Sequence, residues 1–150
     1  MIQRKQTIYL FLAFVAIVCC LCMQVGSFEP VNMGTSAEMY NLFVISDKDG
    51  APAVWPLFTI LLVVAPVTLV TIFLFKKRKV QARLCVVCQV LCLAWCIAYA
   101  VMGWGVGIEN TTFHPAFAAV LPVCAMILLA LARAGILADE RLVRAADRIR

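Results

Sequence analysis

Four long apolar runs dominate the sequence, and short polar segments separate them. Apart from Arg133 in the last run, they contain no Asp, Glu, Lys, Arg or His; they cover residues 7–24, 55–75, 84–104 and 116–137. A helix rises 1.5 Å per residue, so roughly 20 residues cross the ~30 Å of hydrocarbon in a bilayer. Backbone groups inside that hydrocarbon must be paired within their own segment. Each run therefore predicts a membrane-spanning helix, and together they predict an all-α, four-helix membrane bundle.

Two features modify this reading of the runs. Pro66 and Pro122 lie inside the second and fourth runs, and each predicts a kink because proline removes one helical hydrogen bond. The first run follows Arg4 and Lys5 and in this respect resembles a secretory signal peptide, with a weak cleavage site at residues 25–27. Because the run is longer than the usual ~7–15-residue signal core, we interpret it as a retained helix.

The basic residues predict the orientation of the chain. Lys and Arg concentrate in cytoplasmic segments of membrane proteins, and here Lys48 is the one exception to a sharp segregation. The other twelve precede the first run, connect the second to the third, or follow the apolar core of the fourth: Arg4, Lys5, Lys76, Lys77, Arg78, Lys79, Arg83, Arg133, Arg141, Arg144, Arg148 and Arg150. An even number of spans then places both termini in the cytoplasm. Trp55 and Trp104 fit the outer interface, which indole side chains favour.

The segments predicted outside the membrane are long enough to fold. Residues 39–45 are β-prone, residues 47–50 (DKDG) form a turn signal, and residues 51–54 can return as a second strand. We therefore expect a hairpin within the outer loop 27–54. An isolated hairpin is marginal in water, so it is expected to pack on the second outer loop, 105–115, as a small antiparallel sheet. His114 and Pro115 are expected to start the fourth helix.

The C-terminal segment, residues 138–150, predicts a cytoplasmic amphipathic helix that continues the fourth span, with Gly135 as a soft point. Three roles remain open for it. Arg141, Arg144 and Arg148 can contact an anionic lipid surface. The helix can instead be solvated and only anchor the topology, or it can be a docking surface for a cytoplasmic partner.

Polar side chains at both ends of the chain face the same predicted compartment. Arg4 and Gln6 near the start, and Asp147 and Arg148 near the end, are expected to meet at the cytoplasmic mouth of the bundle. Ion pairs and amide hydrogen bonds between them would form an interaction site. This hypothesis supplies the candidate site residues of the sequence, since no catalytic or metal-binding set is evident.

Eight cysteines raise the possibility of metal, haem or thiol redox chemistry. Cys85, Cys88, Cys92 and Cys96 share one face of the third predicted helix, and the others are Cys19, Cys20, Cys22 and Cys124. Closed zinc sites usually combine loops with polar supporting groups, which this pattern lacks. Small apolar side chains also allow helices to approach closely. We interpret the cysteines as packing residues and expect no cofactor.

Composition excludes several other classes. Hydrophobic residues make up 65% of the chain and charged residues 14%, against about 45–50% and 25% in soluble domains. The net charge of +5 is distributed between apolar runs, so it indicates topology rather than a nucleic-acid surface. Ion-coupled transporters usually carry an ionisable side chain inside the bilayer, and intramembrane proteases need a catalytic set there. The runs provide neither.

Both ends of the chain carry a recognisable pattern. Residues 1–10 (MIQRKQTIYL) and 139–150 (DERLVRAADRIR) resemble the start and the end of a bacterial membrane family known as domain of unknown function 4293. The basic inner loop and the four-run layout also fit, so the resemblance covers one domain over residues 1–150. It implies a protein of the bacterial inner membrane, and it implies no activity.

The sequence therefore favours a non-enzymatic accessory or scaffold component of the bacterial inner membrane. Its expected partners are the lipid bilayer and a membrane protein or a second copy of itself, with no nucleic acid. The alternative is a protein that binds or transports a lipid or apolar small molecule between its helices. A thiol, metal or haem redox protein is the third possibility.

Overall fold

The structure, a computed structural model, describes residues 5–30, 36–45, 54–75, 77–105 and 111–147. Within these residues the chain forms four α-helices, as the apolar runs predict. They are α1 (Lys5–Cys22), α2 (Trp55–Phe73), α3 (Arg78–Ala100) and α4 (Leu121–Asp147). A π-helical turn, η1 (Val101–Gly105), extends α3, and a 3₁₀ turn, η2 (Phe117–Val120), leads into α4.

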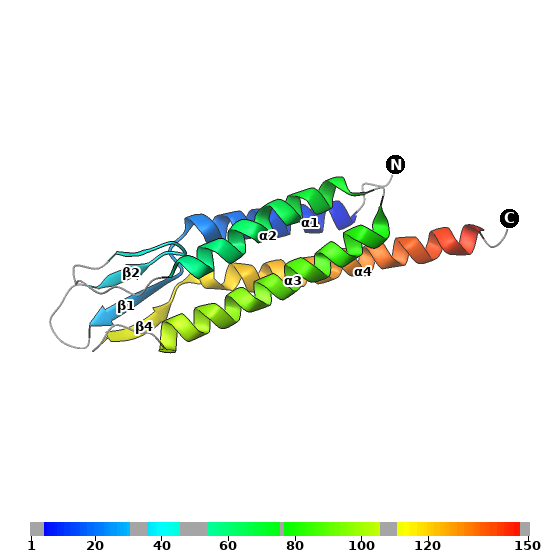
Figure 1. The fold of residues 1–150 in the computed structure, drawn as a ribbon. Coiled ribbons are helices and arrows are strands. Elements are labelled where there is room, and N and C mark those ends of the chain that lie inside the picture. Colours follow the sequence, from blue (N-terminus) through cyan, green and yellow to red (C-terminus); the bar gives the residue numbers. More distant parts are fainter. Residues whose placement is uncertain (1–4, 31–35, 46–53, 76, 106–110, 148–150) are drawn as a thin grey trace.

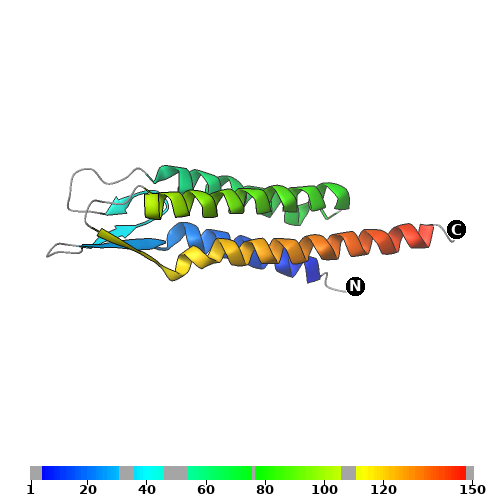
Figure 2. The ribbon, with the colours of Figure 1, turned by 90° about the horizontal axis from the view of Figure 1, so that it is seen from below.

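The helices pack side by side as an up-down-up-down bundle (Figures 1 and 2). The main contacts join α1 to α2, α2 to α3, α3 to α4, and α4 back to α1, so sequence neighbours are antiparallel, as short connections require. The two termini lie at one end of the bundle and a small β-sheet lies at the other (Figure 1). We call these the terminal end and the sheet end.

The helices are apolar on the outside as well as in the core. On α1, Leu10, Ala13, Ile17 and Cys20 are fully buried at helical spacing, which gives the contact face for α2 and α4. Exposed positions of the helices are also apolar, and Phe73, Val90, Ile97 and Ile127 are each more than half exposed. A surface of this kind suits a lipid solvent rather than water.

Three of the described helices are long and apolar enough to cross a membrane. They cover Trp55–Phe73, Arg78–Trp104 and Phe117–Val143, whereas the apolar part of α1, Gln6–Cys22, is shorter. The helix α3 begins at Arg78, before the third apolar run, because basic side chains have good helix propensity and the helix continues past the apolar segment.

The sheet is built from the two loops at the sheet end, one between α1 and α2 and the other between α3 and α4. It contains β1 (Gly26–Pro30), β2 (Ala37–Met39), β3 (Val44–Ile45) and β4 (Thr111–Pro115), in the order β3-β2-β1-β4. All three pairings are antiparallel. The expected antiparallel sheet between the loops 27–54 and 105–115 is confirmed by the pairing of β1 with β4, which are separated in the sequence by α2 and α3.

The predicted hairpin is wrong in its position. Residues 39–45 do not form one strand, because the chain turns between β2 and β3, where the Tyr40 N–H donates to the Phe43 carbonyl at 2.9 Å. The predicted turn at 47–50 and most of the return strand lie outside the described residues, and Val54 is in no strand. The sequence pattern gave no signal for β1.

Three further expectations change around α4. His114 and Pro115 belong to β4 and do not start the helix. Pro122 is the second residue of α4, where the N–H that proline lacks has no helical partner in any case, so it causes no mid-helix kink. Gly135 is not a break, because α4 runs through it. There an added Cβ would lie 2.8 Å from the Gln6 Cγ atom, so Gly135 allows α1 to approach closely.

Gly103 and Phe113 provide a test of how the sheet is seated on the bundle. A Cβ atom at Gly103 would lie 2.5 Å from the Phe113 Cε1 atom, and the ring is held by Phe28, Tyr99 and Trp104 at centroid distances of 5.1–5.6 Å. Gly103→Ala is expected to lower the free energy of unfolding by about 1–3 kcal/mol, as overpacking does. Thermal unfolding in detergent measures the loss.

A second substitution separates this clash from a backbone effect. In the double variant with Phe113→Leu, the smaller side chain leaves room for the new methyl group. Gly103→Ala is then expected to cost less than it does alone. Equal costs in the two backgrounds would show that Phe113 does not restrict this position.

Candidate functional site

The turn between β2 and β3 inserts one buried amide into the sheet end of the bundle. The Asn41 side chain is fully buried. Its Nδ2 atom donates to the Cys20 carbonyl at 2.6 Å, and its Oδ1 atom accepts from the Trp95 Nε1–H at 3.1 Å. One side chain thus connects the sheet to α1 and to α3, which are not neighbours in the bundle.

This contact satisfies a backbone group that the helix itself leaves open. The last four carbonyls of a helix have no partner within it. At the end of α1, the Cys19 carbonyl accepts from the Met23 N–H at 3.0 Å, and the next carbonyl accepts from Asn41. Among the described residues, every buried side-chain nitrogen and oxygen has a hydrogen-bond partner.

The terminal end of α2 repeats this arrangement. The Val70 carbonyl accepts from the Leu74 N–H at 3.1 Å, and the following carbonyl, of Thr71, accepts from the buried Gln81 side chain at 3.1 Å. In both helices, one of the last carbonyls therefore accepts a hydrogen bond from a backbone N–H. The next carbonyl accepts one from the side-chain amide of a residue outside the helix.

An aromatic cluster surrounds the Asn41 junction. Trp95 and Tyr99, one turn apart on α3, stack with a centroid distance of 5.1 Å. The Tyr99 hydroxyl donates to the Val25 carbonyl at 2.6 Å, immediately before β1. The inward face of the sheet adds Phe28 and Phe113, so the sheet rests on α3 through rings and two hydrogen bonds.

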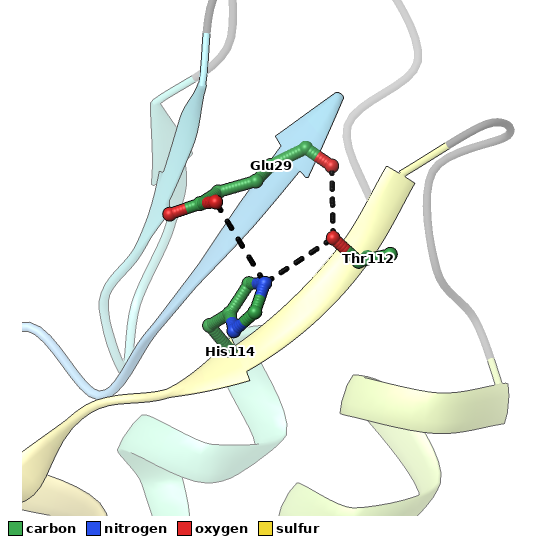
Figure 3. A network of polar contacts seen from close by, with 3 residues as sticks. All are labelled: Glu29, Thr112 and His114. Carbon is green, nitrogen blue, oxygen red and sulfur yellow. Dashed lines mark hydrogen bonds and ion pairs between the residues drawn. The ribbon is translucent and has the colours of Figure 1, made fainter. Parts of the chain in front are cut away.

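The opposite face of the sheet is polar. Figure 3 shows Glu29 of β1 with Thr112 and His114 of β4 on one surface. The His114 Nε2 atom lies 3.7 Å from the Glu29 carboxylate and 3.2 Å from the Thr112 hydroxyl, which also donates to the Glu29 carbonyl at 3.3 Å. The His114 and Glu29 side chains are 56% and 61% exposed.

This polar group does not have the geometry of a catalytic relay. In a relay, one ring nitrogen of histidine receives the proton of the nucleophile while the other contacts the orienting carboxylate. Here both contacts involve the same nitrogen, Nε2. The three side chains are also open to water, so the arrangement fits a solvated surface contact.

A nearby tyrosine links the polar face of the sheet to the turn. The Tyr40 hydroxyl donates to the Glu38 carboxylate at 3.1 Å, and this hydrogen bond and the negative charge together raise the pKa of the phenol. The Tyr40 ring stacks on Phe43, with centroids 5.3 Å apart.

At the terminal end of the bundle, three helices meet at Asp139 of α4. The Gln6 Nε2 atom of α1 donates to the Asp139 carboxylate. The Arg78 Nη1 atom of α3 donates to the Asp139 backbone carbonyl at 3.2 Å. We call Gln6, Arg78 and Asp139 the Asp139 cluster. Beyond it, α4 projects past the ends of the other helices (Figures 1 and 2).

Of the predicted site residues, Gln6 belongs to the cluster, and Arg141 and Asp147 are on α4. Gln6 bonds to Asp139, which the sequence pattern did not single out. Arg4 and Arg148 lie outside the described residues, and the side chains of Asp147 and Arg144 are not described. Arg141 is exposed on the projecting part of α4. The proposed pairing of Arg4 with Asp147 stays a prediction.

The cysteines of α3 do share a face. Cys85, Cys88 and Cys92 are fully buried and Cys96 is half-buried. The Thr68 hydroxyl of α2 lies 3.6 Å from the Cys88 sulfur, which is close packing between neighbouring helices. Among the described residues, no three His, Cys, Asp or Glu side chains are grouped so that they could hold a metal ion.

Sequence reasoning missed Asn41, Trp95 and Asp139. Asn41 is the one polar side chain between Tyr40 and Ile45, and an amide within an apolar segment needs a partner when it is buried. Trp95 lies inside an apolar run, where its N–H also needs an acceptor. Both signals are present in the sequence, but they do not reveal that these two residues pair.

Replacement of Asn41 tests the junction. Asn41→Ala leaves the Cys20 carbonyl and the Trp95 N–H without this partner, and each unsatisfied buried group costs about 1–3 kcal/mol. We expect a loss of roughly 3 kcal/mol in unfolding free energy by thermal or denaturant unfolding in detergent. Gln24→Ala is the control, because its amide donates to a carbonyl only two residues away. An equal loss in both variants would contradict the role of Asn41.

The Asp139 cluster is tested by a double-mutant cycle. Gln6→Ala and Asp139→Ala are expected to couple by about 1.5–3 kcal/mol, the range for hydrogen bonds to charged groups. The same cycle with Gln6→Ala and Arg141→Ala is the control, since Arg141 is exposed two residues further along α4, about 200° around the helix from Asp139. Additive effects of Gln6 and Asp139 would show that the contact does not stabilise the bundle.

Comparison with known proteins identifies the family of this chain. Among curated proteins, none matches it. The family described as Domain of unknown function (DUF4293) matches over residues 2–149, which confirms the resemblance of the two ends. This match covers nearly the whole chain, including all four helices and the sheet. The protein therefore belongs to the DUF4293 family.

Proposed function

We propose that the protein is a non-enzymatic scaffold or accessory component of the bacterial inner membrane. In this proposal it crosses the membrane four times, with both termini in the cytoplasm. The part of α4 beyond the Asp139 cluster, residues 140–147, binds a cytoplasmic partner. We call this part the α4 stem.

The packing of α1 supports four crossings. Its apolar part is shorter than the other three, at about 25 Å for 17 residues. However, α1 packs between α2 and α4, and its buried positions run from Leu10 to Cys20. Any bilayer that surrounds α2 and α4 must therefore also surround α1.

The charge distribution supports the orientation. The terminal end of the bundle carries Lys77, Arg78 and Lys79 at the start of α3 and Arg141 on α4. The sheet end carries the carboxylates Glu29 and Glu38. Positive residues accumulate on the cytoplasmic side of membrane proteins, so the terminal end is assigned to the cytoplasm.

The observation that carries the proposal is the α4 stem itself. The helix continues without interruption to Asp147, which takes it about 12 Å past Asp139. Leu142 and Val143 on the stem are 70% and 46% exposed. Apolar side chains on a helix that has left the bundle are costly in water and are typical of a helix that docks in a partner groove.

The Asp139 cluster gives the stem a fixed direction. Gln6 and Arg78 hold the root of the stem from two other helices. A straight helix held in this way points away from the bundle instead of lying on the membrane surface. This geometry favours a protein partner over the lipid-surface contact that Arg141, Arg144 and Arg148 suggest from sequence.

Site-specific photocrosslinking in living cells tests the proposal. A photoreactive phenylalanine at Leu142 or Val143 is expected to capture the same protein, identified by mass spectrometry. The control is the same residue at Val123, which is exposed at the opposite end of α4 and is expected to capture no such protein.

A substitution that disrupts the apolar surface of the stem tests whether the crosslink is specific. Leu142→Asp, combined with the photoreactive residue at 143, is expected to abolish the adduct because the apolar contact is lost. Adducts that persist with Leu142→Asp, or adducts made only of two copies of this chain, would contradict a partner docked on the stem.

A further inference from the structure

The turn that carries Asn41 exposes a group of large apolar side chains. Leu42 is 48% exposed, Phe43 51% and Ile45 53%. Leu42 and Phe43 lie at the sheet end, on the segment that joins β2 to β3, whereas Ile45 belongs to β3 and pairs with Glu38. The polar face of the same sheet carries Glu29, Thr112 and His114, so the turn and this face have opposite solvent preferences.

The depth of this turn follows from its anchor. Asn41 is bonded to the Cys20 carbonyl, and Cys20 is 14 residues along α1 from Gln6 of the Asp139 cluster, or about 21 Å at 1.5 Å per residue. The charged groups of that cluster belong at the cytoplasmic edge of the hydrocarbon. Because the hydrocarbon is ~30 Å thick, the level of Cys20 lies inside the outer leaflet.

Two polar groups that the turn places at this depth, the Tyr40 N–H and the Asn41 amide, have partners within the protein. Non-helical backbone at membrane depth needs internal partners. The Tyr40 N–H donates to the Phe43 carbonyl, and both ends of the Asn41 amide are paired. Tyr40 itself stacks on Phe43 and donates its hydroxyl to Glu38. A ring with one apolar and one charged neighbour is typical of the boundary between lipid and water.

We propose that the β2–β3 turn is a membrane-inserted element, with Leu42 and Phe43 in contact with the acyl chains of the outer leaflet. The occupant of this surface is lipid. Trp55, at the start of α2 and 58% exposed, adds a further exposed apolar side chain at the same end of the bundle. This inference rests on the proposed membrane crossing and is independent of the α4 stem.

The experiment uses the full-length protein purified into phospholipid nanodiscs. A photoreactive phenylalanine is placed separately at Phe43, Leu42, Val90 and Glu29, and lipid adducts are detected by mass spectrometry. Val90 reports on the exterior of α3 and Glu29 on the polar face of the sheet. Lipid adducts are expected when the photoreactive residue is at Phe43, Leu42 or Val90. No lipid adduct is expected when it is at Glu29.

The control positions separate the two proposals. An adduct at Val90 without adducts at Phe43 and Leu42 overturns the insertion of the turn and leaves the membrane crossing intact. No lipid adduct at Val90 overturns the crossing itself. Crosslinks from Phe43 to a second copy of the chain overturn the assignment of lipid as the occupant.

A conservative variant provides a second test in case the chains with a photoreactive residue do not fold. Phe43→Trp keeps an aromatic ring at the turn. Its added emission is expected to be quenched by phospholipids brominated on their acyl chains, and not by a water-soluble quencher. Quenching by the water-soluble agent alone overturns the proposal.

Discussion

At the sheet end of the bundle, α1 presents the Cys20 carbonyl after the helix has run out of N–H partners, and the buried Asn41 amide supplies the missing donor. The same amide accepts from Trp95, so one side chain ties a helix end, a second helix and the sheet together. Asn41 lies two residues after Met39, which pairs with Gly26. The position of the sheet on the bundle, the ring cluster on Phe113 and the placement of the β2–β3 turn all depend on this contact.

The bundle is braced by polar contacts near its two ends and packed by apolar side chains between them. Near the terminal end of α2, the Gln81 side chain of α3 donates a hydrogen bond to the Thr71 carbonyl, as Asn41 donates to the Cys20 carbonyl of α1. Between these levels, the α3 cysteines and the small residues of α1 bring the helices close together. The described side chains that are exposed beyond the helical bundle lie on the α4 stem, on the β2–β3 turn and on the polar face of the sheet.

The sequence predicted the four helices because their signal is long and uniform. It also predicted a sheet between the loops 27–54 and 105–115, since an isolated hairpin would have been unstable. The strand positions could not be predicted, because β1, β2 and β3 are short and their pairing is decided by tertiary contacts with Asn41 and Tyr99. The site expected from Arg4, Gln6, Asp147 and Arg148 stays a prediction. The bond of Gln6 to Asp139 depends on the length of α4 and on the absence of a side chain at Gly135.

The pairing of β1 with β4 also constrains how the chain is assembled. These strands are separated in the sequence by α2 and α3, and Asn41 meets its donor partner, Trp95 of α3, only after that helix is in place. During synthesis, α1 and β1 emerge long before β4 does. The sheet can therefore be completed only late, once α2 and α3 have been synthesised and β4 has followed them. A chain truncated before β4 would leave one edge of β1 unpaired, so a complete sheet reports that β1 and β4 have reached the same end of the bundle.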